Sequence, residues 1–166
     1  MTPEIRFEAL ADHDRSGFSC GEPDLDAYFQ RQIGQDVRRS TAAAYVAVDE
    51  VTGKVAAFYT ISATSLRLEA LPMDLARKLP RYPLVPAALI GRMAVAQDWQ
   101  GKGLGEAVLA EAAYTAIASG LGVYALLVRP KNDAARRFYL RHGFVTTADG
   151  ENMLLPLATA RRGAGR

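Results

Sequence analysis

Residues 100–105 have the composition of an anion-binding loop. They read Gln-Gly-Lys-Gly-Leu-Gly and stand between an apolar stretch and a helix-forming one. The amides in the first turn of a helix have no partner within the helix, and the helix dipole is positive there. Glycines let such amides approach a ligand, and they permit left-handed backbone angles. We therefore predict a cradle for a phosphate or a pyrophosphate at this loop.

The spacing of the glycines excludes two common nucleotide-binding loops. A P-loop needs four residues between its glycines and then Gly-Lys-Ser/Thr, but here Glu106 stands where the hydroxyl is required. The dinucleotide fingerprint Gly-x-Gly-x-x-Gly is also absent, because Gly101, Gly103 and Gly105 follow the pattern Gly-x-Gly-x-Gly. A tight strand–helix turn without a ligand is the simplest alternative. The preceding apolar strand and the basic surroundings favour a ligand.

Composition places the chain among ordinary soluble proteins. It has 166 residues, of which 49% are hydrophobic and 23% charged. No apolar run approaches the ~20 residues that a membrane helix needs, and the first residues lack the apolar core of a signal peptide, so we expect a cytoplasmic protein without a membrane partner. The single cysteine, Cys20, excludes an intrachain disulfide, and no Cys/His cluster has the spacing of a metal site. We therefore expect no metal.

The charges are distributed unevenly along the chain. The formal net charge is only +2, but residues 77–141 hold ten Lys and Arg against four Asp and Glu. A basic half of this kind attracts phosphate-rich ligands, either a nucleotide cofactor or a nucleic acid. The alternative is that these charges only solvate helix faces.

The hydrophobic pattern predicts strands and helices in alternation. Strands are expected at 5–10, 42–50, 54–66, 87–95 and 123–130, with a closing hairpin within 144–157. Helices are expected at 22–39, 72–79, about 103–119 and 132–143, and three prolines make 80–86 an extended connector. The order predicts one α/β domain over residues 1–158, with a mixed central sheet of about six to seven strands and about four helices. The basic tail, 159–166, is expected to fray.

Two segments resemble the motifs of the GNAT N-acetyltransferases. The first, AVAQDWQGKGLG, is similar to the acetyl-CoA-binding motif Gln/Arg-x-x-Gly-x-Gly/Ala of that family, which Gln100, Gly103 and Gly105 match. The second, NDAARRFYLRHGF, resembles the family pattern Asn-x-x-Ala-x-x-Phe-Tyr-x-x-x-Gly-Phe. The residues that match it are Asn132, Ala135, Phe138, Tyr139, Gly143 and Phe144. The predicted element order also matches over nearly the whole chain, so the resemblance implies the GNAT fold and acetyl transfer from acetyl-CoA.

The resemblance also implies roles for individual residues. Backbone groups of Met93, Ala94 and Val95 should bind the pantetheine arm, and Asn132 should contact the cofactor arm. Tyr139 should protonate the departing thiolate, for which a phenol with an ordinary pKa of roughly 10 is suited. The alternative for Tyr139 is a core aromatic beside Phe138. The pyrophosphate should be held by the amides of Gln100, Gly101, Lys102, Gly103, Leu104 and Gly105.

A closer resemblance is to the GNAT toxins of bacterial type II toxin–antitoxin modules. The shared pieces are Cys20-Gly21, Leu25-Asp26, Gln35-Asp36, Pro80-Arg81-Tyr82-Pro83 and Gly91-Arg92. The resemblance implies acetylation of the amino group on aminoacyl-tRNA, arrest of translation, a ribbon-helix-helix antitoxin as partner, and a homodimer.

A polyanionic acceptor would need a basic rim around the acetyl group. An aminoacyl ester amine is weakly basic, so a strong general base is unnecessary; Asp36 is the nearest option, and its alternative is an ion pair with Arg39 or another neighbour on its helix. Two other functions remain open, namely acetylation of a small amine or a protein N-terminus, and non-catalytic binding of acyl-CoA. The candidates for the rim are Arg38, Arg39, Arg77, Lys78, Arg81 and Arg92.

Overall fold

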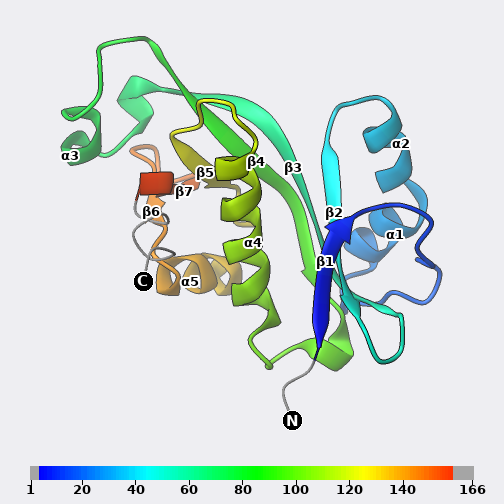
Figure 1. The fold of residues 1–166 in the computed structure, drawn as a ribbon. Helices are drawn as coiled ribbons and strands as arrows, with labels where there is room; N and C mark the ends of the chain where they lie inside the picture. Colours follow the sequence, from blue (N-terminus) through cyan, green and yellow to red (C-terminus); the bar gives the residue numbers. More distant parts are fainter. Residues whose placement is uncertain (1–3, 159–166) are drawn as a thin grey trace. The chain divides into compact units, whose positions relative to one another are not determined.

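The computed structural model describes residues 4–158 and shows a mixed α/β fold (Figure 1). The strands are β1 (Ile5–Ala9), β2 (Ala43–Asp49), β3 (Val55–Arg67), β4 (Leu84–Val95), β5 (Ala125–Val128), β6 (Val145–Thr146) and β7 (Met153–Pro156). The helices are α1 (Pro23–Arg31), α2 (Ile33–Arg38), α3 (Met73–Ala76), α4 (Leu104–Ala118) and α5 (Asp133–Arg141), with 3-10 turns η1 (Leu68–Ala70) and η2 (Gln97–Trp99). This order confirms the predicted fold class.

The strands are hydrogen-bonded in the order β1-β2-β3-β4-β5-β7-β6. The described residues form two compact units, 4–62 with 91–112 and 63–90 with 113–158. We call them the first and the second unit. Strands β3 and β4 and helix α4 contribute residues to both.

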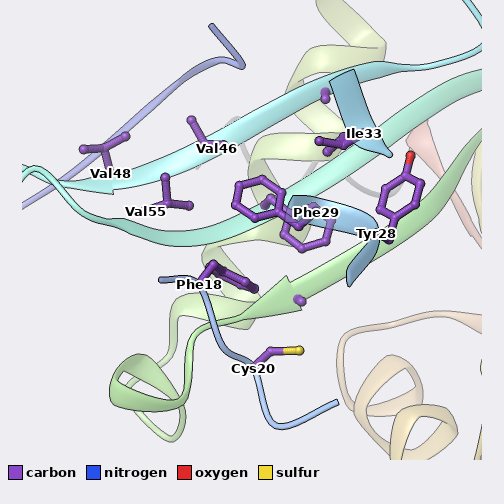
Figure 2. Packing of buried hydrophobic residues seen from close by; sticks show 11 residues of the cluster. Phe18, Cys20, Tyr28, Phe29, Ile33, Val46, Val48 and Val55 are labelled. Atoms are coloured by element: carbon purple, nitrogen blue, oxygen red, sulfur yellow. The ribbon is translucent and has the colours of Figure 1, made fainter. Parts of the chain in front are cut away.

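In the first unit, β1, β2 and β3 form an antiparallel meander whose register shifts between Ala47 and Val48. Figure 1 shows α1 and α2 lying against these strands. Figure 2 shows the core that they enclose, with Phe18 and Phe29 beside valines of β2 and β3. The Phe29 ring stacks on Phe58, with centroids 4.4 Å apart. This aromatic packing fixes α1 on the sheet, and Ile33 of α2 is buried in the same cluster.

The helix predicted over residues 22–39 is interrupted. It ends at Arg31 and resumes at Ile33, because Gln32 has a φ of −116°, far from the helical value. Gly34 follows at once and weakens the helical preference of this stretch. The structure therefore has five α-helices within residues 4–158, where about four were expected.

In the second unit, β4 and β5 pair in parallel, and β7 pairs antiparallel with both β5 and β6. The closing hairpin was predicted, but the sequence did not show that β7 would stand between β5 and β6. Leu66, Val85, Leu127 and Leu154 contribute to the core of this unit.

The proline-rich connector begins as predicted, but its last residues belong to β4. The strand starts at Leu84, and the Pro86 carbonyl accepts a hydrogen bond from the Tyr124 amide at 2.9 Å. A proline lacks the backbone N–H donor but keeps its carbonyl, so a strand tolerates it where only the carbonyl forms a hydrogen bond. The helix predicted at 72–79 is shorter, with α3 ending at Ala76. The predicted tail, 159–166, lies outside the described residues.

Across residues 4–158 the structure contains no helix whose length and apolar character would let it cross a bilayer.

Candidate functional site

The glycine loop joins η2 to α4 in the first unit. Gly101 and Gly103 have φ values of 76° and 83°, in the left-handed region. A Cβ at either position would meet nothing within 4 Å. Glycine is therefore favoured there by the backbone angle, and steric crowding is not the reason. The Ala107 amide donates to the Gly103 carbonyl at 3.2 Å, and α4 thus begins at this glycine. The amides of residues 104–106 therefore stand in the first turn, without acceptors in their own helix.

The Gln100 side chain fastens the loop to its surroundings. Its amide nitrogen donates to the Cys20 carbonyl at 2.8 Å and to the Val95 carbonyl at 2.9 Å. Gln100 thus ties the end of β4 to the segment before α1. The sequence indicated a ligand-binding amide at Gln100 but not this structural role of its side chain, because Cys20 lies far away in the chain.

The loop is held by a second pair of contacts. The Gln97 amide donates to the Ser19 carbonyl at 2.9 Å, and the Ser19 hydroxyl donates to the Gln97 side-chain oxygen at 3.2 Å. The exposed Lys102 ammonium stands 5.5 Å from the centroid of the Trp99 ring. The Lys102 ammonium is therefore a cation beside the loop where we predict that an anion binds.

Met93, Ala94 and Val95 form the end of β4, immediately before η2. The parallel register of β4 with β5 runs from Ala87 to Leu89, so these three residues lie beyond it on the strand. The strand thus leads directly to the glycine loop within the first unit.

In the second unit, Tyr139 lies on α5. Its ring is 5.3 Å from that of Phe138 and 5.2 Å from that of Phe144, between centroids. Burial raises the pKa of the Tyr139 phenol above its ordinary value, since the anion would lose its hydration. The phenol is therefore protonated at neutral pH, as an acid must be before it acts.

Asn132 is the N-cap of α5. Its side-chain oxygen accepts a hydrogen bond from the Ala135 amide at 2.8 Å. Asn is a favoured N-cap residue, so the sequence also held a signal for this capping role, which the prediction of a cofactor contact did not include. The cap uses the side-chain oxygen, so any contact with a cofactor would fall to the amide nitrogen or the backbone.

The six Arg and Lys candidates for the acceptor rim fall into two sets of three, and all six are exposed. The first unit contains Arg38 and Arg39 at the end of α2 and Arg92 on β4. The second unit contains Arg77, Lys78 and Arg81, which follow α3. Each unit therefore contains three of the six candidate residues.

Asp36, the candidate base, has a different partner from the one expected. Its carboxylate accepts a hydrogen bond from the Tyr28 hydroxyl at 2.6 Å. The Arg92 guanidinium lies over the same tyrosine ring, 4.5 Å from its centroid. Neither contact was predicted, because the three residues come from separate elements. Within residues 4–158, no three side chains of His, Cys, Asp or Glu come together as a metal site would need.

Comparison with known proteins identifies the family. The acetyltransferase (GNAT) family matches residues 7–144. The "tRNA-acetylating toxin" of Mycobacterium tuberculosis is 30% identical over 151 residues, which cover 89% of each chain.

Two solved structures share the fold. AtaT complexed with acetyl-methionyl-tRNAfMet has a TM-score of 0.88 at 24% identity, covering 97% of this chain and 99% of that one. A Tyr-to-Phe mutant of the AtaT toxin, bound to the C-terminus of the antitoxin AtaR and acetyl-CoA, has a TM-score of 0.81 at 20% identity, covering 98% and 99%. The family match and the mycobacterial relative both span most of the chain, and we conclude that it belongs to the acetyltransferase (GNAT) family.

Proposed function

We propose that this acetyltransferase moves the acetyl group of acetyl-CoA to the amino group of an aminoacyl-tRNA and thereby stops translation. The observation that carries the proposal is the likeness to the mycobacterial tRNA-acetylating toxin over 89% of both chains. The glycine loop and the Tyr139 motif, which the chemistry requires, lie within the part matched by the family.

The first unit supplies the groups for the cofactor. The amides of residues 100–105 and the Lys102 ammonium hold the pyrophosphate of acetyl-CoA, since first-turn amides and a nearby cation both favour an anion. The backbone of Met93 to Val95 binds the pantetheine arm as an added strand would. An amide near Met93 then polarises the acetyl carbonyl.

The second unit supplies the acid. The amine nitrogen attacks the acetyl carbon, its new bond replaces the carbon–sulfur bond, and the sulfur leaves with the electron pair. Tyr139 gives its proton to that sulfur and is reprotonated by the proton that the attacking amine releases, directly or through water. Its raised pKa keeps the phenol protonated until the sulfur departs. The Asn132 cap fixes the start of the helix on which Tyr139 lies.

The exposed Arg and Lys side chains of the candidate rim provide the surface that binds the acceptor. A tRNA is a polyanion, and Arg and Lys side chains contribute to its binding by neutralising phosphates. The amine of an aminoacyl ester is less basic than that of lysine and is largely unprotonated near neutral pH. The reaction therefore proceeds without a carboxylate base, in agreement with the engagement of Asp36 by Tyr28. The enzyme acts in the cytoplasm as a homodimer, and a ribbon-helix-helix antitoxin neutralises it.

The test is mass spectrometry of charged tRNA incubated with the protein and acetyl-CoA. We expect a gain of one acetyl group on the aminoacyl moiety, and none on uncharged tRNA. Two further acceptors, a small primary amine and a peptide with a free N-terminus, are included in parallel. Acetylation of either one with charged tRNA unmodified would overturn the proposal.

A further inference from the structure

Arg92 is held at its backbone and at its side chain within the first unit. The Arg92 amide donates a hydrogen bond of 2.9 Å to the hydroxyl of Thr60, which is only 3% exposed. The Arg92 side chain is exposed, but its guanidinium stands 4.5 Å from the centroid of the Tyr28 ring. An aromatic face attracts a cation at this distance, so the guanidinium has a preferred place before any ligand arrives.

Gly91 preserves the backbone contact. A Cβ at this position would lie 3.2 Å from the Thr60 hydroxyl oxygen, closer than most Cβ contacts. A side chain there would press on the atom that accepts the Arg92 amide. Glycine avoids this close approach, and its backbone angle plays no part, since its φ is not among the positive values of the described chain.

Tyr28 is itself immobilised. It is 6% exposed and belongs to the aromatic core, and its ring stacks near that of Phe58 with centroids 6.4 Å apart. Figure 2 shows its hydroxyl pointing away from Phe18 and Cys20. That hydroxyl donates to a side-chain oxygen of Asp36 on α2 at 2.6 Å, which is a short hydrogen bond. Burial, and then the bond to Asp36, raise the pKa of Tyr28, so the donor persists at neutral pH.

We propose that Tyr28 is a positioning residue that holds the Arg92 guanidinium on its ring as a preformed binding group for a phosphate of the acceptor, with Asp36 fixing the tyrosine. The inference rests on the proposed function, which supplies the phosphate. A guanidinium held by its face keeps its N–H groups in its own plane, where they can form paired hydrogen bonds with a phosphate. Ordering this long side chain in advance also removes an entropy loss from binding.

Asp36 takes part in this arrangement through its hydrogen bond with Tyr28. The carboxylate hydrogen-bonds to the hydroxyl at the end of the ring, while Arg92 lies over the ring face. Three elements, α1, α2 and β4, are thereby joined through one side chain. The end of α2 also holds Arg38 and Arg39, two and three residues after Asp36 in the chain.

A double-mutant cycle tests the inference on the full chain. The KM for charged tRNA, the kcat and the acetyl-CoA affinity are measured for the wild type, Tyr28→Leu, Arg92→Gln and the double variant. We expect Tyr28→Leu to raise the KM about fivefold, in line with a cation–π contact, and to leave acetyl-CoA affinity unchanged. In the Arg92→Gln background, Tyr28→Leu should raise the KM for charged tRNA by less than about twofold. Independent, multiplicative effects would overturn the inference.

Phe29→Leu is the matched control for loss of core packing. Phe29 is fully buried in the same cluster but is not the ring beneath Arg92, so its truncation weakens the core without releasing the guanidinium. We expect the tRNA KM of this variant to stay within about twofold of the wild type. Tyr28→Phe, which keeps the ring, should raise the KM less than Tyr28→Leu. An equal rise in Phe29→Leu would assign the effect to a softened core and overturn the inference.

A readout without substrate separates the two proposals. In NMR spectra, the Arg92 Nε–H signal should show an upfield ring-current shift that Tyr28→Leu abolishes. A wild type that acetylates charged tRNA, but shows neither this shift nor coupling in the cycle, defeats the positioning role alone. A wild type that shows the shift, but does not acetylate charged tRNA, defeats the proposed function and with it the role given to Arg92.

Discussion

At the scale of single residues, the proposed chemistry depends most on Tyr139. Tyr139→Phe keeps the ring between Phe138 and Phe144 and removes only the hydroxyl. We expect kcat to fall about a hundredfold, as for loss of a general acid, with the acetyl-CoA dissociation constant unchanged. Stopped assays with charged tRNA and calorimetry with acetyl-CoA measure the two quantities. Unchanged turnover would remove the acid role from Tyr139.

The pH dependence follows from the burial of the same residue. Because burial raises the pKa of Tyr139, the acid form that donates the proton persists beyond the ordinary phenol pKa of roughly 10. The rate should therefore not fall between about pH 7 and about pH 9, measured over times short enough to limit hydrolysis of the aminoacyl ester. A decline of kcat within this window, with charged tRNA intact, would contradict a protonated Tyr139.

Asn132 allows its structural role to be separated from a cofactor role. Asn132→Ala removes the cap bond to the Ala135 amide and should lower the free energy of unfolding by about 1 kcal/mol. Asn132→Asp retains a capping oxygen but lacks the amide donor, so it should keep the stability. Denaturant unfolding gives the first quantity and acetyl-CoA titration the second. Weaker acetyl-CoA binding by Asn132→Asp at full stability would identify the amide nitrogen as a ligand.

The residues for which the sequence predicts roles are those in short local motifs. The spacing of the glycines in residues 100–105 predicts an anion-binding loop, and the segment around Tyr139 resembles a family motif that implies its role. The contacts around Arg92 could not be predicted, because Tyr28, Asp36 and Arg92 meet only after α1, α2 and β4 have packed. The second hydrogen bond of Gln100, to Cys20, depends on packing in the same way.

At the scale of elements, the turn before α4 is set by backbone angles. Gly103→Ala places a Cβ in open space but in the left-handed region, which costs roughly 1–2 kcal/mol in the folded state. We expect that loss in the free energy of unfolding, together with weaker acetyl-CoA binding, because relief of the strain turns the first amides of α4. Chemical denaturation and calorimetry report these effects.

Gly17→Ala is the control for the glycine loop. Gly17 also has open space around its Cβ position, and no positive φ is found for it. The substitution should change the free energy of unfolding by less than about 0.5 kcal/mol. Equal losses at Gly17 and Gly103 would show that the left-handed angle is not the cause.

The types of element were predictable, and their arrangement was less so. Apolar periodicity located the strands and helices, but the break at Gln32 depends on how Ile33 enters the core, where it is fully buried. The place of β7 between β5 and β6 is a matter of pairing between distant segments. Hydrophobic alternation indicates that a segment is a strand but does not select its neighbours.

At the scale of the whole molecule, the proposed function predicts that basic residues in each unit contribute to acceptor binding. Arg38→Glu in the first unit and Arg77→Glu in the second should each raise the KM for charged tRNA and lower the slope of log KM against log salt by about 1. Affinity for acetyl-CoA should not change. Lys54→Glu, an exposed reversal just before β3, serves as the control and should change neither quantity. A uniform effect of all three reversals would indicate general charge attraction without a defined rim.

The division into two units has a consequence for the synthesis of this chain. The first unit consists of residues 4–62 and 91–112, so a ribosome must deliver the second piece before the first can finish folding. The other unit waits in turn for residues 113–158. A nascent chain that stops before residue 91 therefore contains the Tyr28 core without the strand end and the glycine loop that complete the unit. Folding of the second unit, and with it the capacity to acetylate, is therefore delayed until residues 113–158 have been translated.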